Sequence, residues 1–136
     1  MCRDGDDGGS AWVFLVFLSC LKKGSLGDNL LIGNRVLIGH NCNVFDTDAH
    51  PFDKDERHNQ FKQIFSSGHP KEINLNDIEI IIEDDVWIGA NVTVLKGIKI
   101  GKGAIIGAGS IVTKNIEPFT VNAGSPSRML RRLDEK

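Results

Sequence analysis

Hydrophobic residues recur every six positions along most of this chain, and this repeat limits the fold more than any other feature. Ten units of six residues can be written, four before residue 50 and six from residue 82 onward. Each unit begins with an aliphatic residue: Leu26, Ile32, Ile38, Val44, Ile82, Ile88, Val94, Ile100, Ile106 and Val112. The fifth position is usually small or apolar, with Asp48 as the exception.

Glycine occupies the second position in six of the ten units, and Asn, Asp or Gly occupies the fourth position in eight. Asn, Asp and Gly tolerate a positive φ angle, so each unit is interpreted as a short strand followed by a tight bend. A chain that bends every six residues can coil and stack each strand on the equivalent strand of the next turn. An α-helix would need apolar residues at i, i+3, i+4 and i+7, which this spacing does not provide. The repeat therefore predicts a parallel β-helix, an all-β fold.

Two segments depart from the repeat. Residues 50–81 are charged and lack the six-residue pattern, so they are interpreted as a loop extruded from one corner of the coil, and long loops on compact scaffolds often carry function. We expect an atypical N-terminal segment at 1–23, the coil with its loop at 24–120, and a C-terminal turn with a short basic helix at 121–136. Within the first segment, the apolar run at 11–18 is shorter than the roughly 20 residues of a membrane span. It is expected to be a buried strand, a short helix or a segment docked on a partner chain.

Composition excludes several classes of protein. The chain has 136 residues, enough for one domain, and its net charge of −2 argues against nucleic acid as a partner. The acidic residues before the apolar run are unlike a signal peptide. Three cysteines at irregular spacing indicate neither a disulfide framework nor a metal knuckle, which favours a reducing cytoplasm.

The repeats, together with "GAGSIVTKNI" and "NAGSPSRMLRRL", resemble the hexapeptide-repeat acyltransferases. Within that family the chain looks most like the maltose and galactoside (sugar) O-acetyltransferases. The resemblance implies a left-handed coil with three six-residue units per turn. It also implies a homotrimer that binds acetyl-CoA as co-substrate in the grooves between subunits and acetylates a sugar or saccharide.

The resemblance and the chemistry together single out His50 as the catalytic base. Acetyl transfer to a hydroxyl needs a group that takes the hydroxyl proton, and a neutral imidazole suits this role at neutral pH. His50 follows directly on the unit "VFDTDA", where the loop leaves the coil, and Asp48 or Asp46 is expected to orient its ring. His69, in "SGHP", is the second candidate. Neither a metal nor a covalent enzyme intermediate is required, and the four histidines do not suggest the three-His zinc cluster of a related enzyme class.

Several cofactor contacts are implied by the family's motifs. The "WIGA" run would line the thioester end, and its last residue, Ala90, replaces a Ser of some relatives and leaves only its backbone N–H for the oxyanion. The basic C-terminal residues would bind the CoA phosphates. The implied set is Trp87, Ala90, Ala108, Thr113, Lys114, Arg128 and Arg131.

Two alternatives stay open. Transfer to an amino sugar differs only in the nucleophile, so the sequence does not separate O-acetylation from N-acetylation. The N-terminal segment also lacks the acceptor-binding residues of the sugar acetyltransferases. This departure motivates a different hypothesis, a truncated trimer that binds CoA or serves a structural purpose without turnover.

Overall fold

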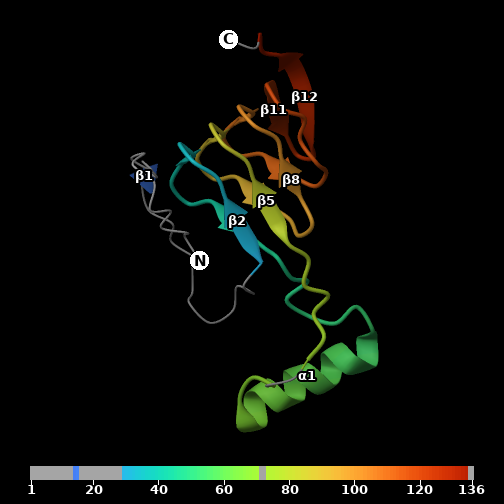
Figure 1. Cartoon of the computed structure of the whole chain (residues 1–136). Coiled ribbons are helices and arrows are strands. Elements are labelled where there is room, and N and C mark those ends of the chain that lie inside the picture. The colour runs from blue at the N-terminus through green and yellow to red at the C-terminus, as the bar shows by residue number, and fades with distance from the viewer. Residues whose placement is uncertain (1–13, 16–28, 71–72, 135–136) are drawn as a thin grey trace.

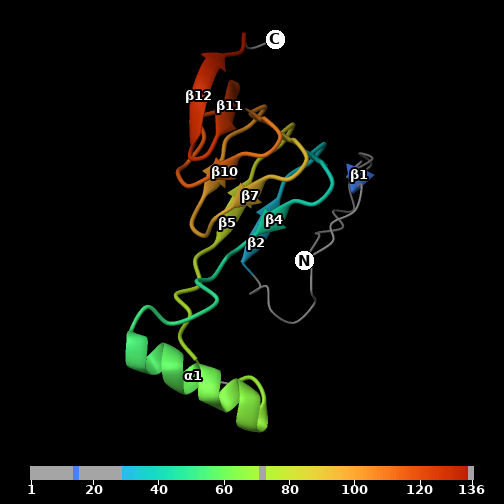
Figure 2. The same cartoon turned by 180° about the vertical axis from the view of Figure 1, so that it is seen from behind.

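The structure, a computed structural model, describes residues 14–15, 29–70 and 73–134. The strands of its coil are two or three residues long and form three flat walls around a triangular interior (Figure 1 and Figure 2). The first wall contains β2 (Leu30–Ile32), β5 (Ile80–Ile82) and β8 (Lys99–Ile100). The third wall contains β4 (Asn43–Val44), β7 (Thr93–Val94) and β10 (Ile111–Val112).

The second wall is the longest. It runs in the order β1 (Phe14–Leu15), β3 (Leu37–Ile38), β6 (Trp87–Ile88), β9 (Ile105–Ile106), β11 (Thr120–Gly124) and β12 (Ser127–Arg132). All its pairs are parallel except the last, β11 with β12. Successive strands visit the first, second and third walls in turn, so one coil comprises three six-residue units, as the resemblance implies. We call the bends between the first and second, second and third, and third and first walls the first, second and third corners.

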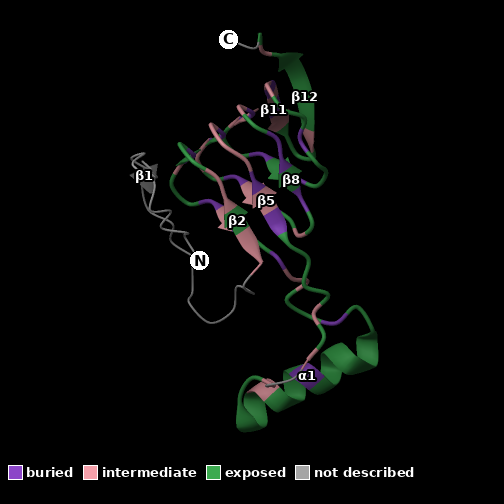
Figure 3. Ribbon diagram, viewed as in Figure 1, coloured by how far each residue is buried: buried purple, intermediate pink, exposed green. Residues whose placement is uncertain are grey.

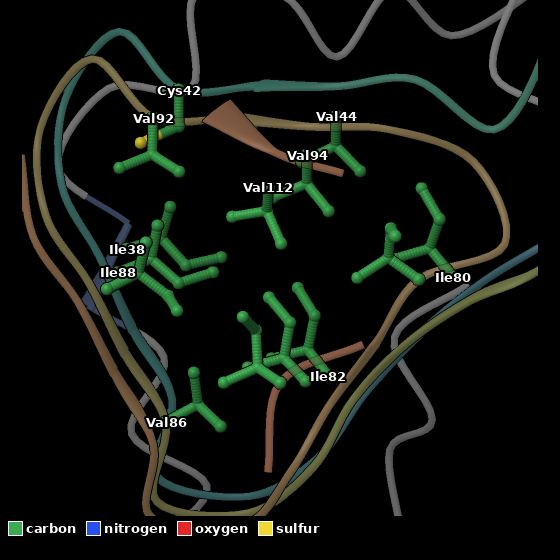
Figure 4. Close-up of a cluster of buried hydrophobic side chains, with 14 of the residues drawn as sticks. Ile38, Cys42, Val44, Ile80, Ile82, Val86, Ile88, Val92, Val94 and Val112 are labelled. Carbon is green, nitrogen blue, oxygen red and sulfur yellow. The ribbon is translucent and has the colours of Figure 1, made fainter. Parts of the chain in front are cut away.

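The interior is filled by the residues that the repeat assigns to it. Side chains from the first and fifth positions of the units point into the triangle and stack coil on coil (Figure 4). They include Val36, Ile38, Ile82, Val86, Ile88, Val92, Val94, Ile100, Ile106 and Val112, each no more than 4% exposed. Burying one such aliphatic side chain contributes about 1.5–3 kcal/mol. The repeated burial of Ile and Val therefore holds the coils together.

The second and fourth positions of each unit favour small or turn-forming residues for different physical reasons. The fourth position does adopt a positive φ at Asn41, Asp85 and Asn91, as predicted. The second-position glycines instead make room for the next coil, since a Cβ atom on Gly39 would lie 2.5 Å from the backbone nitrogen of Ala90. Side chains also stack at the second corner, where Asn41 Nδ2 donates to Asn91 Oδ1 at 2.7 Å.

The short basic helix expected within residues 121–136 is wrong, because residues 127–132 form strand β12. After β11 the chain turns at Gly124, whose φ is +107°, and folds back as an antiparallel hairpin. Pairing with β12 satisfies the backbone groups on the outer edge of β11, which a helix would leave without partners.

The extruded segment contains a helix that the sequence analysis did not predict. Helix α1 (Lys54–Ser67) lies away from the coil, attached to it through the third corner (Figure 1). The helix begins at Asp53, whose carboxylate accepts hydrogen bonds from the backbone N–H groups of Asp55 and Glu56. Regular pairing resumes with β5 at Ile80, two residues earlier than expected. Figure 3 shows α1 almost wholly exposed apart from Gln60, so it lacks the apolar stripe that usually reveals a helix.

Most of the predicted N-terminal segment, including the apolar run apart from Phe14–Leu15, lies outside the described residues. Among the described residues, no helix has the length and apolar character needed to cross a membrane.

Candidate functional site

The extruded segment leaves the coil through a narrow neck. Its two ends are joined by backbone hydrogen bonds from Asp48 N to Leu75 O at 3.0 Å and from Ile78 N to Asp46 O at 2.8 Å. Lys96, from the third corner of the next coil, donates to Asp48 Oδ2 at 2.6 Å and to Asn76 O at 3.1 Å. The neck therefore joins both ends of the extruded segment to the coil.

Asp48 belongs to this neck and does not orient His50. Its carboxylate accepts hydrogen bonds from Lys96 and from Asn76 Nδ2. The Lys96 ammonium holds the pKa of the Asp48 carboxyl below its ordinary value, and the Asn76 amide adds to this effect. Asp46 is buried, 1% exposed, and its backbone carbonyl accepts the Ile78 N–H described above.

His50 is oriented by a residue that the sequence analysis missed. Its Nδ1 lies 2.8 Å from Oε1 of Gln60, a buried side chain in the middle of α1. Gln60 Nε2 in turn donates to Ala49 O at 3.4 Å, which turns the amide oxygen toward the imidazole. The bond between them therefore requires the proton on Nδ1 and leaves Nε2 as a lone-pair acceptor. A capping signal, Asp53 followed three residues later by Glu56, could have revealed the helix that carries Gln60.

A second residue of α1 holds the chain on the other side of His50. Arg57 Nη1 donates to Pro51 O at 3.1 Å and to Phe52 O at 3.0 Å. His50 is thus fixed by α1 through its ring and through the peptide groups around it. The ring borders a pocket of about 440 Å³ that is also lined by Lys54, Arg57, His58 and Phe61.

The other three histidines lie on α1, just beyond it, and on the coil. His69 is exposed and follows α1, beyond Gly68 at the C-terminal end of the helix. His40 is exposed at the second corner, and His58 lies on α1 and lines the pocket. Within the described part of the chain, no group of three or more His, Cys, Asp or Glu side chains could hold a metal ion.

Three of the expected cofactor contacts line one side of the coil. Trp87 lies in the second wall with 53% of its surface exposed. Ala90 and Ala108 stack at the second corner, where Gly109 N donates to Ala90 O at 2.9 Å and Gly89 approaches the backbone of Ala108. The N–H of Ala90 makes no hydrogen bond within the described residues, so it can still donate to a ligand.

The hairpin extends this side of the coil. Arg131 pairs with Val121 and Arg128 pairs with Ala123, while a bulge in the pairing accommodates one extra residue of β12. Residues opposite each other in antiparallel strands point to the same side of the sheet, so both arginines share one face. Both are exposed. The two arginines are brought to one face by the bulge in β12.

Thr113 and Lys114 lie elsewhere, exposed at the third corner that also carries Lys96. The chain therefore brings together Trp87, Ala90, Ala108, Arg128 and Arg131 along the second wall and second corner. It places His50 on the segment that leaves from the third corner. The expected base and the expected thioester contacts thus lie on different corners of the coil.

Comparisons with known proteins agree with this architecture. Residues 79–114 match the family model described as bacterial transferase hexapeptide, six repeats. A galactoside O-acetyltransferase from Lactococcus lactis is 36% identical over 107 residues, which cover 79% of this chain and 45% of that protein. A crystal structure of a galactoside acetyltransferase in complex with coenzyme A superposes with a TM-score of 0.63 and 37% identity, covering 77% of this chain and 46% of that one.

A shorter match is closer in sequence. A 2,3,4,5-tetrahydropyridine-2,6-dicarboxylate N-acetyltransferase from Clostridium perfringens is 50% identical over 56 residues, which cover 41% of this chain and 24% of that protein. The chain spans less than half the length of each of these three proteins. The left-handed parallel β-helix expected from the resemblance is confirmed.

Proposed function

Since this chain is a hexapeptide-repeat protein similar to the sugar O-acetyltransferases, we propose that it moves an acetyl group from acetyl-CoA to a hydroxyl group of a sugar or saccharide. The observation that carries this proposal is the Gln60–His50 pair. It leaves Nε2 of His50 without a proton in a ring that borders a pocket. An imidazole in that state is the group that a hydroxyl nucleophile needs.

The proposed reaction is a direct transfer. The acceptor oxygen attacks the thioester carbonyl while His50 Nε2 takes the hydroxyl proton, and the C–S bond then breaks. The CoA thiolate leaves and is protonated by the imidazolium, so His50 returns to its starting state. The Ala90 N–H supplies a donor for the oxyanion that forms on the carbonyl.

We further propose that the working enzyme is a homotrimer whose sites lie between subunits. Acetyl-CoA would lie along the second wall of one subunit, with its phosphates near Arg128 and Arg131. The His50 of a neighbouring subunit would reach this groove from the third corner. The support is the separation of His50 and Ala90 onto different corners of one chain.

N-acetylation is the second candidate. The 50% identity to an N-acetyltransferase extends over 56 residues of this chain. An amine acceptor also has to lose a proton, so the same imidazole would serve. Comparing matched sugars and amino sugars as acceptors separates the two reactions.

The first experiment measures release of the CoA thiol from acetyl-CoA with a panel of sugars, amino sugars and water. We expect His50→Ala to lower kcat by about 10²–10⁴-fold, the usual contribution of a general base. His69→Ala is the matched control, because His69 is exposed at the far end of α1, and it should keep full turnover.

Two results would contradict the proposal. Full activity in the His50→Ala variant would remove His50 as the base. Binding of CoA without turnover on any acceptor would instead support the non-catalytic trimer.

A further inference from the structure

One face of α1 combines positive charge with an aromatic ring. Lys54, Arg57, His58 and Phe61 follow the i, i+3, i+4, i+7 spacing that places side chains on one side of a helix, and all four line the pocket beside His50. The five lining residues include no carboxylate. A pocket of this kind favours an anion.

The acidic residues near the pocket are directed elsewhere. The Asp48 carboxylate is bound by Lys96 and Asn76, and the carboxylate of Asp53 caps α1. Lys54 Nζ does contact Asp55 Oδ2 at 2.7 Å, but about three quarters of each side chain is exposed. Water screens an exposed ion pair of this kind, so Lys54 can exchange Asp55 for a ligand.

Among the cationic groups of the pocket, Arg57 is the one whose side chain is already held in position to bind an anion. Its Nη1 is already bound to the carbonyls of Pro51 and Phe52, which holds the guanidinium beside His50. Its Nε and Nη2 groups have no hydrogen-bond partner within the described residues. This edge of the guanidinium presents two parallel N–H donors, the geometry that binds a carboxylate or a phosphate through two oxygens.

Phe61 supplies an apolar surface in the same pocket. It lies one helical turn beyond Arg57, and 58% of its surface is exposed. Its ring centroid is 4.6 Å from that of Phe65, which supports it from the next turn. A sugar ring has an apolar C–H face that packs on such an aromatic side chain.

We propose that this pocket selects an acidic acceptor, a sugar that carries a carboxylate or a phosphate group. The anion binds the Nε–Nη2 edge of Arg57 with Lys54 nearby, the sugar ring packs on Phe61, and a hydroxyl group reaches Nε2 of His50. The proposal rests on the proposed acetyl transfer, and it names the acceptor of that same site. The transfer is unchanged: the hydroxyl oxygen gains the acetyl group, and the thiol of CoA gains the hydroxyl proton through His50.

The test compares acceptors that differ at C6, where glucose has a hydroxyl group, glucuronate a carboxylate and glucose 6-phosphate a phosphate ester. Glucose, glucuronate and glucose 6-phosphate are given to the enzyme with acetyl-CoA, and kcat/KM is measured from thiol release. We expect at least one of the two charged sugars to exceed glucose by about 10-fold or more, since a hydrogen bond to a charged group contributes about 1.5–3 kcal/mol. The carboxylate and phosphate sugars identify which anion the pocket prefers.

Variants assign the effect to the helix face. Lys54→Gln should raise the KM for the charged sugar and leave the kcat/KM for glucose nearly unchanged. Arg57→Gln should lower the kcat/KM for the charged sugar more than that for glucose, because Arg57 also supports the chain beside His50. Arg57 also supports the backbone at Pro51, whereas within the described part of the chain Lys54 is hydrogen-bonded to Asp55 alone, so Lys54→Gln tests charge without disturbing the loop. Lys62→Gln is the matched control, because Lys62 is exposed on α1 and does not line the pocket.

Binding is measured in parallel by calorimetry with glucuronate and glucose 6-phosphate. Equal kcat/KM for all three sugars, with no effect of either variant, overturns this inference and leaves the acetyl transfer standing. If no sugar is acetylated but a charged sugar binds and Arg57→Gln weakens that binding, the anion site stands and the proposed transfer fails. Absence of both turnover and binding overturns both.

Discussion

A single amide decides which nitrogen of His50 carries the proton. Gln60 is held by Ala49 O and accepts from Nδ1, so the free lone pair lies on Nε2. Of the two aspartates near His50 in the sequence, Asp48 is bound to Lys96, and the backbone carbonyl of the buried Asp46 accepts the Ile78 N–H. Residue by residue, the site depends on contacts made by α1.

Replacing Gln60 tests its role in positioning the base. Gln60→Ala removes the acceptor for Nδ1–H, so we expect kcat to fall by about 10–100-fold, less than the loss of the base itself. KM for acetyl-CoA should not change. Gln60→Glu keeps an acceptor and adds a negative charge that favours the protonated ring, so activity should be retained while the acidic limb of the pH–rate profile moves to higher pH. An unchanged pH–rate profile in Gln60→Glu would argue that Gln60 only supports the fold.

The repeat glycines can be tested at two positions that differ in their surroundings. Gly39→Ala places a Cβ atom 2.5 Å from Ala90 N, so we expect a loss of about 1–3 kcal/mol in the free energy of unfolding. Gly109→Asn is the matched control, because Gly109 has a φ of +72° and open space around it, and Asn tolerates that φ. Denaturant unfolding measures both. Equal stability of the two variants would contradict the close-packing explanation.

Two elements outside the regular coil contribute the charged groups of the proposed site. Helix α1 supplies the groups around His50, and the β11–β12 hairpin supplies Arg128 and Arg131. The bulge in β12 aligns these two arginines, although their spacing in a regular strand would place them on opposite faces. Both elements stand on opposite ends of the coil (Figure 1).

Arg128 and Arg131 of the β11–β12 hairpin are proposed to bind the CoA phosphates, and this can be tested by replacing them. Arg128→Gln combined with Arg131→Gln should raise the KM for acetyl-CoA by about 10-fold or more and leave kcat nearly unchanged. Arg132→Gln is the matched control, since Arg132 Nη2 is paired with Glu117 Oε2 at 2.5 Å. Steady-state kinetics at constant ionic strength measure the three variants. An equal rise in the KM of the Arg132→Gln control would contradict a specific role of Arg128 and Arg131, because loss of any positive surface charge would then explain the effect.

On the scale of the whole molecule, the coil is a rigid support that holds the two halves of the proposed site apart. His50 is reached through the third corner, whereas Ala90 and Ala108 lie at the second corner. A neighbouring subunit is the simplest way to bring them together, because an interface between unlike surfaces closes into a ring. Activity should then depend on assembly.

Mixing two defective chains tests the shared site. His50→Ala and the Arg128→Gln, Arg131→Gln double variant are unfolded together at equal amounts and refolded. At subsaturating acetyl-CoA, random trimers should have about a quarter of their sites intact, each with His50 and the arginines from different chains. Sedimentation tests whether the mixed chains assemble as a trimer. Activity no greater than that of the separately refolded variants, or full turnover by a monomer, would contradict the shared site.

The sequence predicts the coil well, because the repeat acts locally. Each aliphatic residue at the first position of a described unit faces inward, and Asn41, Asp85 and Asn91 adopt the positive φ that their residue types favour. The prediction that His50 is the base rests on its place where the repeat is interrupted. By contrast, the sequence does not predict α1, because the helix lacks a continuous apolar stripe. It does not predict β12 either, because this strand depends on the turn at Gly124 that pairs it with β11.

What the sequence by itself determined is therefore the coil and the point where it is interrupted. A six-residue spacing of Ile, Leu and Val can be buried only by stacking, whatever the rest of the chain does. The tertiary structure decided which residues meet outside the repeat: Gln60 with His50, Lys96 with Asp48, and Arg128 beside Arg131. The first two contacts join residues separated by ten or more positions, and the third depends on a bulge. The local conformational preferences of these residues predict neither a distant contact nor a bulge. Packing of α1 against its own loop and of β12 against β11 brings them together.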